Sequence, residues 1–270
     1  MCAATSLAAD IEAIGLLGPG MSGWPQARAV LSGSAPYQPQ PTIVPSSQVL
    51  PAAERRRAVR LVHVALAVSG EATAGTNMDL TTLSTVFASS AADTGTCHEL
   101  LQTLATTERQ VSPTRFHNSV HNIAAGYWSI ASRDIGSYTM VCAYDGSFAA
   151  GLLEALSLVV SGHSPVMLVS YDVDYPTPLR EKRPVLDTFA VALLLRPPSS
   201  ESDSVAHLAC SLNGSTAGRM QRPEFESLRL SAPAARALPL LELIAEGRHG
   251  TVGLEYLEGL TLSAVVSPCA

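Results

Sequence analysis

The sequence has few charged residues, and its apolar segments are short. Charged residues make up 15% of the 270 positions and hydrophobic residues 47%, a balance that excludes an intrinsically disordered chain. The longest apolar run, residues 151–160, contains Glu154 and is too short to cross a bilayer as a helix. The formal net charge is −6, so the basic character of nucleic-acid-binding proteins is also missing. We therefore expect a well-packed protein whose partners are neither membranes nor nucleic acids.

Cysteine motifs and targeting signals are missing as well. The five cysteines include no Cys-x-x-Cys pair, which argues against a disulfide framework and against a zinc finger. No basic segment precedes an apolar run at the N-terminus, so we expect no signal peptide. The glycines of residues 15–20 have the wrong spacing for a dinucleotide-binding loop, and Pro19 removes a backbone N–H. These absences predict a cytoplasmic protein without a cofactor.

Short apolar runs alternate with helical periodicities along the chain. We expect strands at residues 11–17, 80–89, 138–143, 165–171, 189–195, 207–212, 252–256 and 260–266, and helices at residues 24–31, 52–72, 96–107, 118–132, 147–161 and 232–246. This alternation indicates a layered α/β fold. We predict a single domain over residues 1–270. Its core is residues 1–200, and a helix and hairpin within residues 201–270 close that core.

Residues 112–169 carry a pattern that is found in a known family. The pattern consists of Ser112-Pro113, Asn122, Gly126, Ile130, Gly136, the stretch Ala143-Tyr144-Asp145-Gly146-Ser147, Gly162 and the strand Val166-Met167-Leu168-Val169. In its order and spacing it resembles the N-terminal half of the β-ketoacyl-ACP synthases, which are thiolase-like condensing enzymes. The resemblance implies an α/β thiolase-like fold, N-terminal half only, with layers around a central mixed sheet.

The same resemblance implies that this chain lacks the catalytic groups of a synthase. Counted from Gly136 or from Gly162, the nucleophilic cysteine of the family falls on Asp145. An aspartate there can cap a helix, but it cannot form an acyl thioester. The two histidine motifs and the glycine-rich turn of the C-terminal half do not occur. We expect no catalytic residues, with Asp145 at a degenerate nucleophile position.

The stretches AYDGSFAAGLLEAL and SPTRFHNSVHN resemble the short chain-length-factor-like proteins of aryl-polyene-type pathways. The resemblance implies a non-catalytic subunit that forms a heterodimer with an active β-ketoacyl-ACP synthase and shapes its acyl tunnel. The pathway would be polyketide, aryl-polyene or fatty-acid-like biosynthesis, and the acyl carrier protein would be met indirectly, through the partner. The strand 138–143 would pair across the dimer axis, together with the aromatic surface of residues 116–128. The interface and tunnel residues would be Phe116, Val120, Tyr138, Val141 and Tyr144.

Two other functions stay open from the sequence. Cys142 with His207 or His249 as base would make a minimal acyltransferase, although a cysteine in an apolar strand is more often inert. A structural homodimer is the second alternative.

Two polar clusters have ordinary explanations. His117 and His121 are four residues apart and could face one metal ion, but no third ligand and no HExxH motif accompany them. We expect no metal site, and the role of the pair stays undefined. The arginines within residues 54–60 are expected to form a solvated helix face, with a docking patch for an acidic carrier protein as the alternative.

Overall fold

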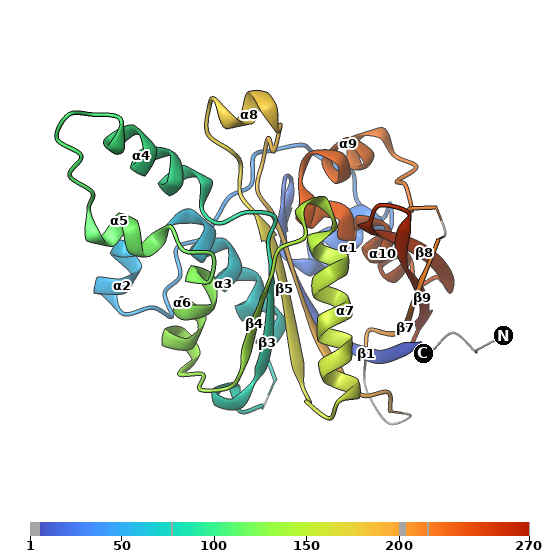
Figure 1. Cartoon of the computed structure of the whole chain (residues 1–270). Coiled ribbons are helices and arrows are strands. Elements are labelled where there is room, and N and C mark those ends of the chain that lie inside the picture. The colour runs from blue at the N-terminus through green and yellow to red at the C-terminus, as the bar shows by residue number, and fades with distance from the viewer. Residues whose placement is uncertain (1–5, 77, 200–203, 215, 270) are drawn as a thin grey trace.

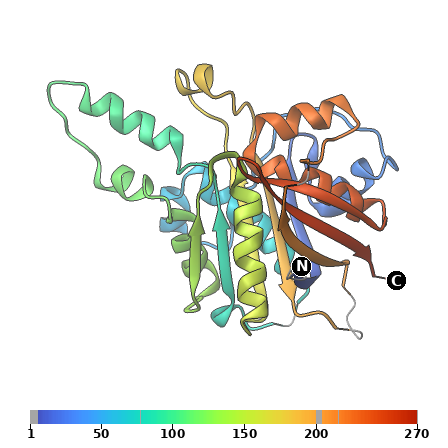
Figure 2. The same ribbon diagram turned by 45° about the vertical axis from the view of Figure 1, so that its right-hand side comes forward.

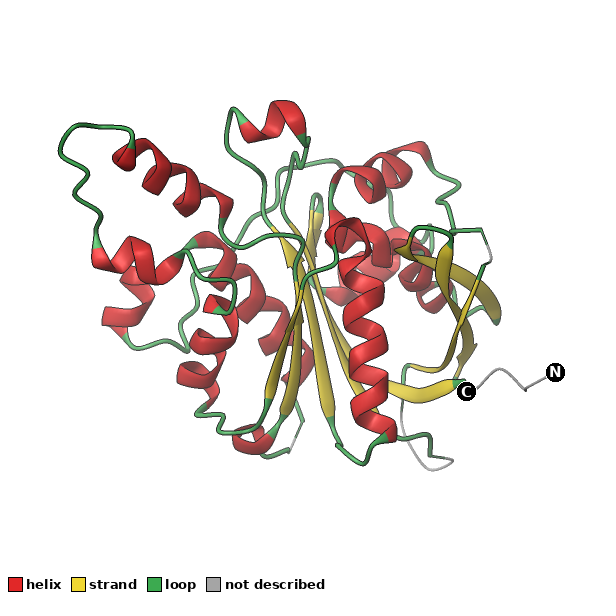
Figure 3. Cartoon of the chain, in the orientation of Figure 1, coloured by secondary structure: helices red, strands yellow, loops and turns green. Residues whose placement is uncertain are grey.

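The computed structural model describes residues 6–76, 78–199, 204–214 and 216–269, which form a mixed nine-stranded sheet with helices on both faces (Figures 1 and 3). The strands are β1 (Leu7–Gly18), β2 (Met21–Ser22), β3 (Ser84–Ala88), β4 (Tyr138–Val141), β5 (Val166–Asp172), β6 (Phe189–Arg196), β7 (Ala206–Asn213), β8 (Gly250–Leu257) and β9 (Leu260–Pro268). Their order is β4-β3-β5-β6-β1-β7-β9-β8, with β2 paired to β1. β3 runs parallel to β4 and to β5, and the other pairs are antiparallel.

The helices divide between the two faces of the sheet. They are α1 (Trp24–Leu31), α2 (Ala52–Arg57), α3 (Arg60–Thr73), α4 (Thr94–Leu104), α5 (Pro113–Asn118), α6 (Ile123–Ser132), α7 (Ser147–Val160), α8 (Leu179–Lys182), α9 (Pro223–Ser231) and α10 (Leu238–Ala245). Short 3-10 turns occur at η1 (Leu80–Thr82), η2 (Tyr144–Gly146) and η3 (Pro233–Ala237). Helices α3 and α6 pack on one face, whereas α1, α7, α9 and α10 pack on the other (Figures 1 and 2). No helix in the described part of the chain is long and apolar enough to cross a membrane.

The core strands follow the two-residue alternation of a buried sheet. Val86 and Leu168 face the α7 side, whereas Phe87 and Val169 face α3 and α6. Every residue of β3 and β5 is buried, as expected for strands that are covered on both faces. The predicted α/β layering is therefore confirmed, and each predicted strand has a counterpart.

Several predicted helices are shorter than expected, because extended residues or a turn interrupt them. The segment 52–72 divides into α2 and α3, with Ala58 and Val59 in extended conformation between them. The segment 118–132 contains the end of α5 and all of α6, with a turn between them. The prediction also missed α9, whose buried residues are only Phe225, Leu228 and Arg229. Its sequence is mostly polar and gives a weak periodic signal.

The two edges of the sheet differ. At β8 the chain covers its own edge, since the Gly218 amide donates to the Gly253 carbonyl at 2.7 Å. The turn before α7 also presses on this strand: a Cβ on Gly146 would lie 2.1 Å from the Tyr256 carbonyl oxygen. At the opposite end, β4 pairs only with β3 among the described strands. β4 is therefore the open edge of the sheet.

The C-terminal segment contributes to the sheet and to one layer. Residues of η3 and α10 belong to the buried cluster that faces α7. The hairpin of β8 and β9 extends the sheet, because β9 pairs with β7. Helix α4 lies apart from these layers and protrudes from the molecule (Figure 1).

Candidate functional site

The turn that joins β4 to α7 is the centre of the candidate site. It consists of η2, and Asp145 lies two residues before the first residue of α7, as expected from the sequence. Tyr144 has φ +52°, a left-handed conformation that is uncommon for a residue with a side chain. The Ser147 hydroxyl accepts a hydrogen bond from the Ala143 amide at 3.0 Å and donates one to the Tyr144 carbonyl at 2.7 Å. These bonds hold the turn in its strained shape.

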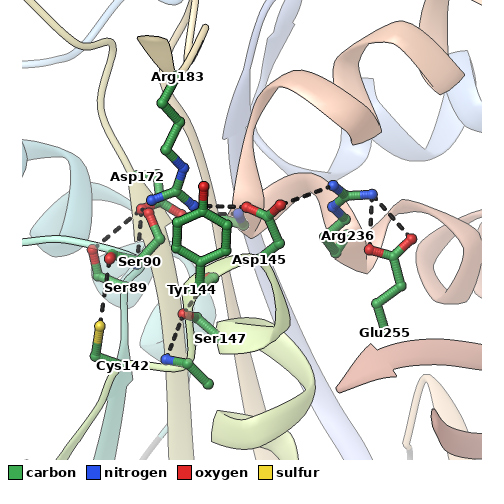
Figure 4. Close-up of polar contacts among 12 residues, drawn as sticks. Ser89, Ser90, Cys142, Tyr144, Asp145, Ser147, Asp172, Arg183, Arg236 and Glu255 are labelled. Atoms are coloured by element: carbon green, nitrogen blue, oxygen red, sulfur yellow. Dashed lines mark hydrogen bonds and ion pairs between the residues drawn. The ribbon is translucent and has the colours of Figure 1, made fainter. Parts of the chain in front are cut away.

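The side chain of Asp145 does not cap the helix, contrary to expectation. The N-cap position of α7 is Gly146, and no side chain bonds to the first turn there. Instead, Asp145 accepts a hydrogen bond from Arg183 at 2.7 Å and lies 3.5 Å from Arg236 (Figure 4). Two guanidinium groups satisfy the carboxylate better than helix N–H groups alone, because both interactions are between full charges.

Asp145 belongs to a chain of alternating charges. In spatial order this charge chain is Arg183, Asp145, Arg236, Glu255, Arg229 and Glu226. It links the segment after α8, the η2 turn, η3, β8 and α9, so segments distant in sequence are held at one place. Hydrogen bonds from Arg229 lower the pKa of Glu226 to about 2. The charge chain therefore ties the C-terminal hairpin to the turn before α7.

Arg183 also covers the ring of Tyr144. Its guanidinium carbon lies 3.6 Å from the centroid of that ring, a cation–π contact (Figure 4). Its Nη1 donates to the Tyr175 hydroxyl at 3.2 Å. The Tyr144 side chain is nevertheless 61% exposed. The turn thus presents an exposed aromatic ring beside a half-buried carboxylate that two arginines engage.

The family model described as "Beta-ketoacyl synthase, N-terminal domain" matches residues 24–249. The chain belongs to this family. A search of curated proteins found no significant match.

Several solved structures of other proteins have the same fold as this chain. The complex of the ketosynthase ApeO with its chain length factor ApeC from Xenorhabdus doucetiae has a TM-score of 0.74 at 23% identity, covering 96% of this chain and 99% of that one. The ishigamide ketosynthase/chain length factor has a TM-score of 0.72 at 13% identity, covering 97% and 99%. The type II PKS structure AntDE:AntF, an acyl-carrier protein in complex with its ketosynthase, has a TM-score of 0.70 at 8% identity, covering 97% and 99%. The predicted thiolase-like fold is confirmed.

A buried carboxylate, that of Asp172, lies behind the turn. Asp172, at the end of β5, accepts hydrogen bonds from the Ser90 amide at 2.9 Å, the Ser90 hydroxyl at 2.6 Å and the Ala234 amide at 2.9 Å (Figure 4). Burial raises its pKa to about 6, although these donors favour the charged form. In the structure Asp172 joins β3, β5 and η3.

The raised pKa of Asp172 makes stability depend on pH. The folded state holds this proton more tightly than the unfolded chain, whose carboxyl titrates near 3.9, so between about pH 4 and pH 6 unfolding releases protons. The free energy of unfolding should therefore fall as pH rises through this window, by roughly 3 kcal/mol, and then level off. Asp172→Asn should remove this slope. Urea titrations of both proteins between pH 4 and pH 7 measure it, and parallel pH profiles would contradict it.

The predicted interface residues lie at different depths. Phe116, Val120 and Tyr138 are exposed, and Tyr138 accepts a hydrogen bond from Asn122 Nδ2 at 3.2 Å. Val141 is partly buried and packs against the core on the α7 side.

One part of that prediction is wrong. Tyr127 and Trp128 are buried in the α3–α6 layer, so the aromatic surface does not extend over residues 116–128. Both side chains belong to the hydrophobic cluster between α3, α6 and the sheet, and burial there keeps them off the surface.

Phe116 borders an apolar hollow beside the protruding helix α4. The hollow has a volume of about 530 Å³ and is lined by Cys97, Leu100, Leu101, Leu104, Val111, Phe116 and Ser119. Leu101 and Leu104 are themselves exposed. The surface of α4 and α5 is therefore more apolar than a solvated surface needs to be.

Cys142 lacks the surroundings of a catalytic cysteine. It is exposed, just beyond the end of β4, rather than buried in a strand as expected. Its Sγ donates to the Ser90 carbonyl at 3.4 Å, and no histidine bonds to it in the described part of the chain. His207 is paired with Asp10 at 2.8 Å, and His249 with Ser267 at 3.0 Å.

The histidine pair does not form a metal centre with other residues. Within the described residues, no three His, Cys, Asp or Glu side chains are grouped so that they could hold a metal ion. His117 is exposed, whereas Nε2 of His121 is buried without a hydrogen-bond partner in the structure.

Proposed function

We propose that this chain is a non-catalytic, chain-length-factor-like subunit that pairs with an active β-ketoacyl-ACP synthase and shapes its acyl tunnel. The observation that carries the proposal is the turn before α7. There a condensing enzyme needs a thiolate, but this chain has Tyr144 and Asp145, and the carboxylate is occupied by two arginines. A turn without a thiol cannot form the acyl-enzyme. We propose no catalytic residue and no cofactor for this chain.

The open edge of the sheet supports the pairing. β4 offers unpaired backbone groups, and such an edge invites another strand unless charges or bulges protect it. The chain has no charged residue on β4. We propose that the edge of β4, with Tyr138 and Val141, joins the partner and that Phe116, Val120 and Tyr144 face the partner's tunnel.

Similar solved structures belong to assemblies of this kind. Two are a ketosynthase with its chain length factor, and another is an acyl-carrier protein with its ketosynthase. By analogy we propose that the carrier protein reaches this chain through the synthase. The pathway would be polyketide, aryl-polyene or fatty-acid-like biosynthesis, in the cytoplasm, and the chain would act as one domain. The four described cysteines are free thiols, which suits a reducing compartment, and Cys2 lies outside the described residues.

The decisive experiment is co-expression with an active β-ketoacyl-ACP synthase from the same organism. Co-elution of the two chains in size-exclusion chromatography and mass spectrometry of the products made on acyl carrier protein would support the proposal. A stable homodimer that ignores the ketosynthase would favour the structural alternative. Acylation of Cys142 in the isolated chain by an acyl thioester would favour the acyltransferase alternative.

Phe116→Ala should lengthen the products of the reconstituted pair by one or more two-carbon units. The phenyl ring borders an apolar hollow, and a close-packed wall does not yield even to one methylene without cost, so bulk there limits chain growth. Leu230→Ala on α9 is the matched control, because Leu230 is also an exposed apolar residue. Product lengths from mass spectrometry that are the same for both variants would contradict a role of Phe116 in the tunnel.

A further inference from the structure

The turn before α7 offers two side chains for the place of the lost nucleophile. Counting along the sequence selects Asp145. The backbone selects its neighbour, because Tyr144 is the residue with the left-handed φ of +52° between the strand and the helix. In enzymes that use a nucleophile between a strand and a helix, the nucleophile stands on such a strained turn, which exposes its side chain above the helix start.

The two side chains differ in exposure and in their contacts. Tyr144 is 61% exposed, whereas the Asp145 side chain is 39% exposed and its carboxylate is engaged by Arg183 and Arg236 (Figure 4). A group that must meet an incoming acyl thioester has to be accessible and not held in ion pairs. Tyr144 meets this condition better than Asp145.

We propose that Tyr144 occupies the nucleophile's place and that Arg183 closes the space in front of it. The guanidinium carbon of Arg183 lies 3.6 Å from the centroid of the Tyr144 ring. Asp145 and the Tyr175 hydroxyl fix the same guanidinium at 2.7 Å and 3.2 Å, so Arg183 is held from three sides. The proposal rests on the proposed function, in that it takes the turn as the vestige of a synthase active site.

This arrangement gives Asp145 and Arg183 positioning roles. Asp145 anchors Arg183, and Arg183 holds the ring of Tyr144. The β8 strand supports the turn from behind, because the Tyr256 carbonyl packs against Gly146. An acyl group is thereby kept out of this subunit and left to the partner's cysteine. In this proposal, the acyl group is excluded because Tyr144 and Arg183 occupy the place of the nucleophile, and not only because the thiol is missing.

Two cysteine variants test which residue stands in the place of the nucleophile. Tyr144→Cys and Asp145→Cys are made separately in a Cys142→Ser background, folding is checked by circular dichroism, and each is incubated with acetyl-CoA. In the acyl transfer, the thiolate attacks the thioester carbonyl, the bond to the coenzyme A sulfur breaks, and coenzyme A leaves as a thiolate that takes a proton from solvent. We expect the cysteine at 144 to be acylated at least about tenfold faster, measured by peptide mass spectrometry. Equal rates, or a faster reaction at 145, would overturn the proposal.

The role of Arg183 is tested by adding Arg183→Gln to the Tyr144→Cys variant. Alkylation by iodoacetamide, followed from pH 5 to pH 10, separates charge from access. With Arg183 present, the midpoint of the curve of alkylation rate against pH, which gives the pKa of the thiol at position 144, should lie below the ordinary value of about 8.5. Without it, the midpoint should rise while the rate at high pH increases, because the shield is gone. A structural role alone would move neither value, and an unchanged profile would overturn this part of the proposal.

A measurement on the natural tyrosine covers the case in which a cysteine variant does not fold. Nitration of Tyr144 by tetranitromethane should be faster in Arg183→Gln than in the unsubstituted chain, and an unchanged rate would count against the shield. All these tests use the isolated chain. Failure to pair with a ketosynthase would therefore refute the proposed function without deciding between Tyr144 and Asp145.

Discussion

Replacing Tyr138 with Lys is expected to abolish co-elution of this chain with the ketosynthase partner proposed above. Tyr138 lies on the open edge strand β4, and its side chain is 44% exposed. At a paired edge the ammonium group would be buried without a counter-charge, and truncation of central aromatic residues alone commonly costs 2 kcal/mol or more. We expect the affinity to fall at least about a hundredfold, which corresponds to roughly 2.7 kcal/mol. Size-exclusion chromatography and titration calorimetry of the pair measure this change.

Two controls make the result interpretable. Leu212→Lys places the same charge on β7 at a side chain that is 43% exposed, and it should leave the pairing intact. Tyr138→Phe removes only the hydrogen bond from Asn122 and should pair almost normally. Val141→Lys is a weaker test, because Val141 packs on the core and the lysine would also disturb the fold. Normal pairing of Tyr138→Lys would refute the β4 interface.

Arg229→Ala should lower the free energy of unfolding by about 3 kcal/mol. The Arg229 side chain is 5% exposed and donates to Glu226 at 2.8 Å and to Glu255 at 2.7 Å. Removing one partner of a buried ion pair leaves the other charges without compensation, which typically costs about 3–5 kcal/mol. For a chain of this size the melting temperature should fall by roughly 6–12 °C. Differential scanning calorimetry gives the value.

An exposed ion pair provides the control for this variant. Arg248 pairs with Glu246 while its side chain is 60% exposed, so Arg248→Ala should cost less than about 1 kcal/mol. The Glu226 carboxyl adds a pH signature. Its pKa is lowered to about 2, so its contribution is complete above about pH 4.3 and is lost as pH falls toward 2. Arg229→Ala should lose this acid dependence. Equal stability losses in the two alanine variants would contradict the role of the charge chain.

Much of the fold could be predicted because the signals are local. Strands β5 and β6 are continuous apolar runs, and their burial on both faces follows from that pattern. Helix α9 could not be predicted this way. Its stability depends on few buried residues and on the ion pairs of Arg229, whose partner Glu255 is 26 residues away.

The site was predictable only in part, because its side chains pair with partners that are distant in the sequence. Asp145 was placed correctly at the start of α7, because the spacing of the motif is local. Its partner Arg183 is 38 residues away, and nothing in the pattern of either segment signals the pairing. The buried site of Asp172 gives no local signal either, since its hydrogen-bond donors come from two other parts of the chain. The left-handed backbone of Tyr144 has no signature in its residue type, because tyrosine seldom adopts it.

The unequal edges of the sheet set the size of any assembly. A sheet that is open at both ends can add strands repeatedly and grow into a fibre. In this chain, the β8 end is engaged by the segment around Gly218 and by the turn at Gly146, whereas the β4 end is free. Growth through the sheet can therefore take one neighbour and then stops. A partner with one free edge of its own would complete a closed pair, and the chain would gain a defined stoichiometry from the way in which it folds.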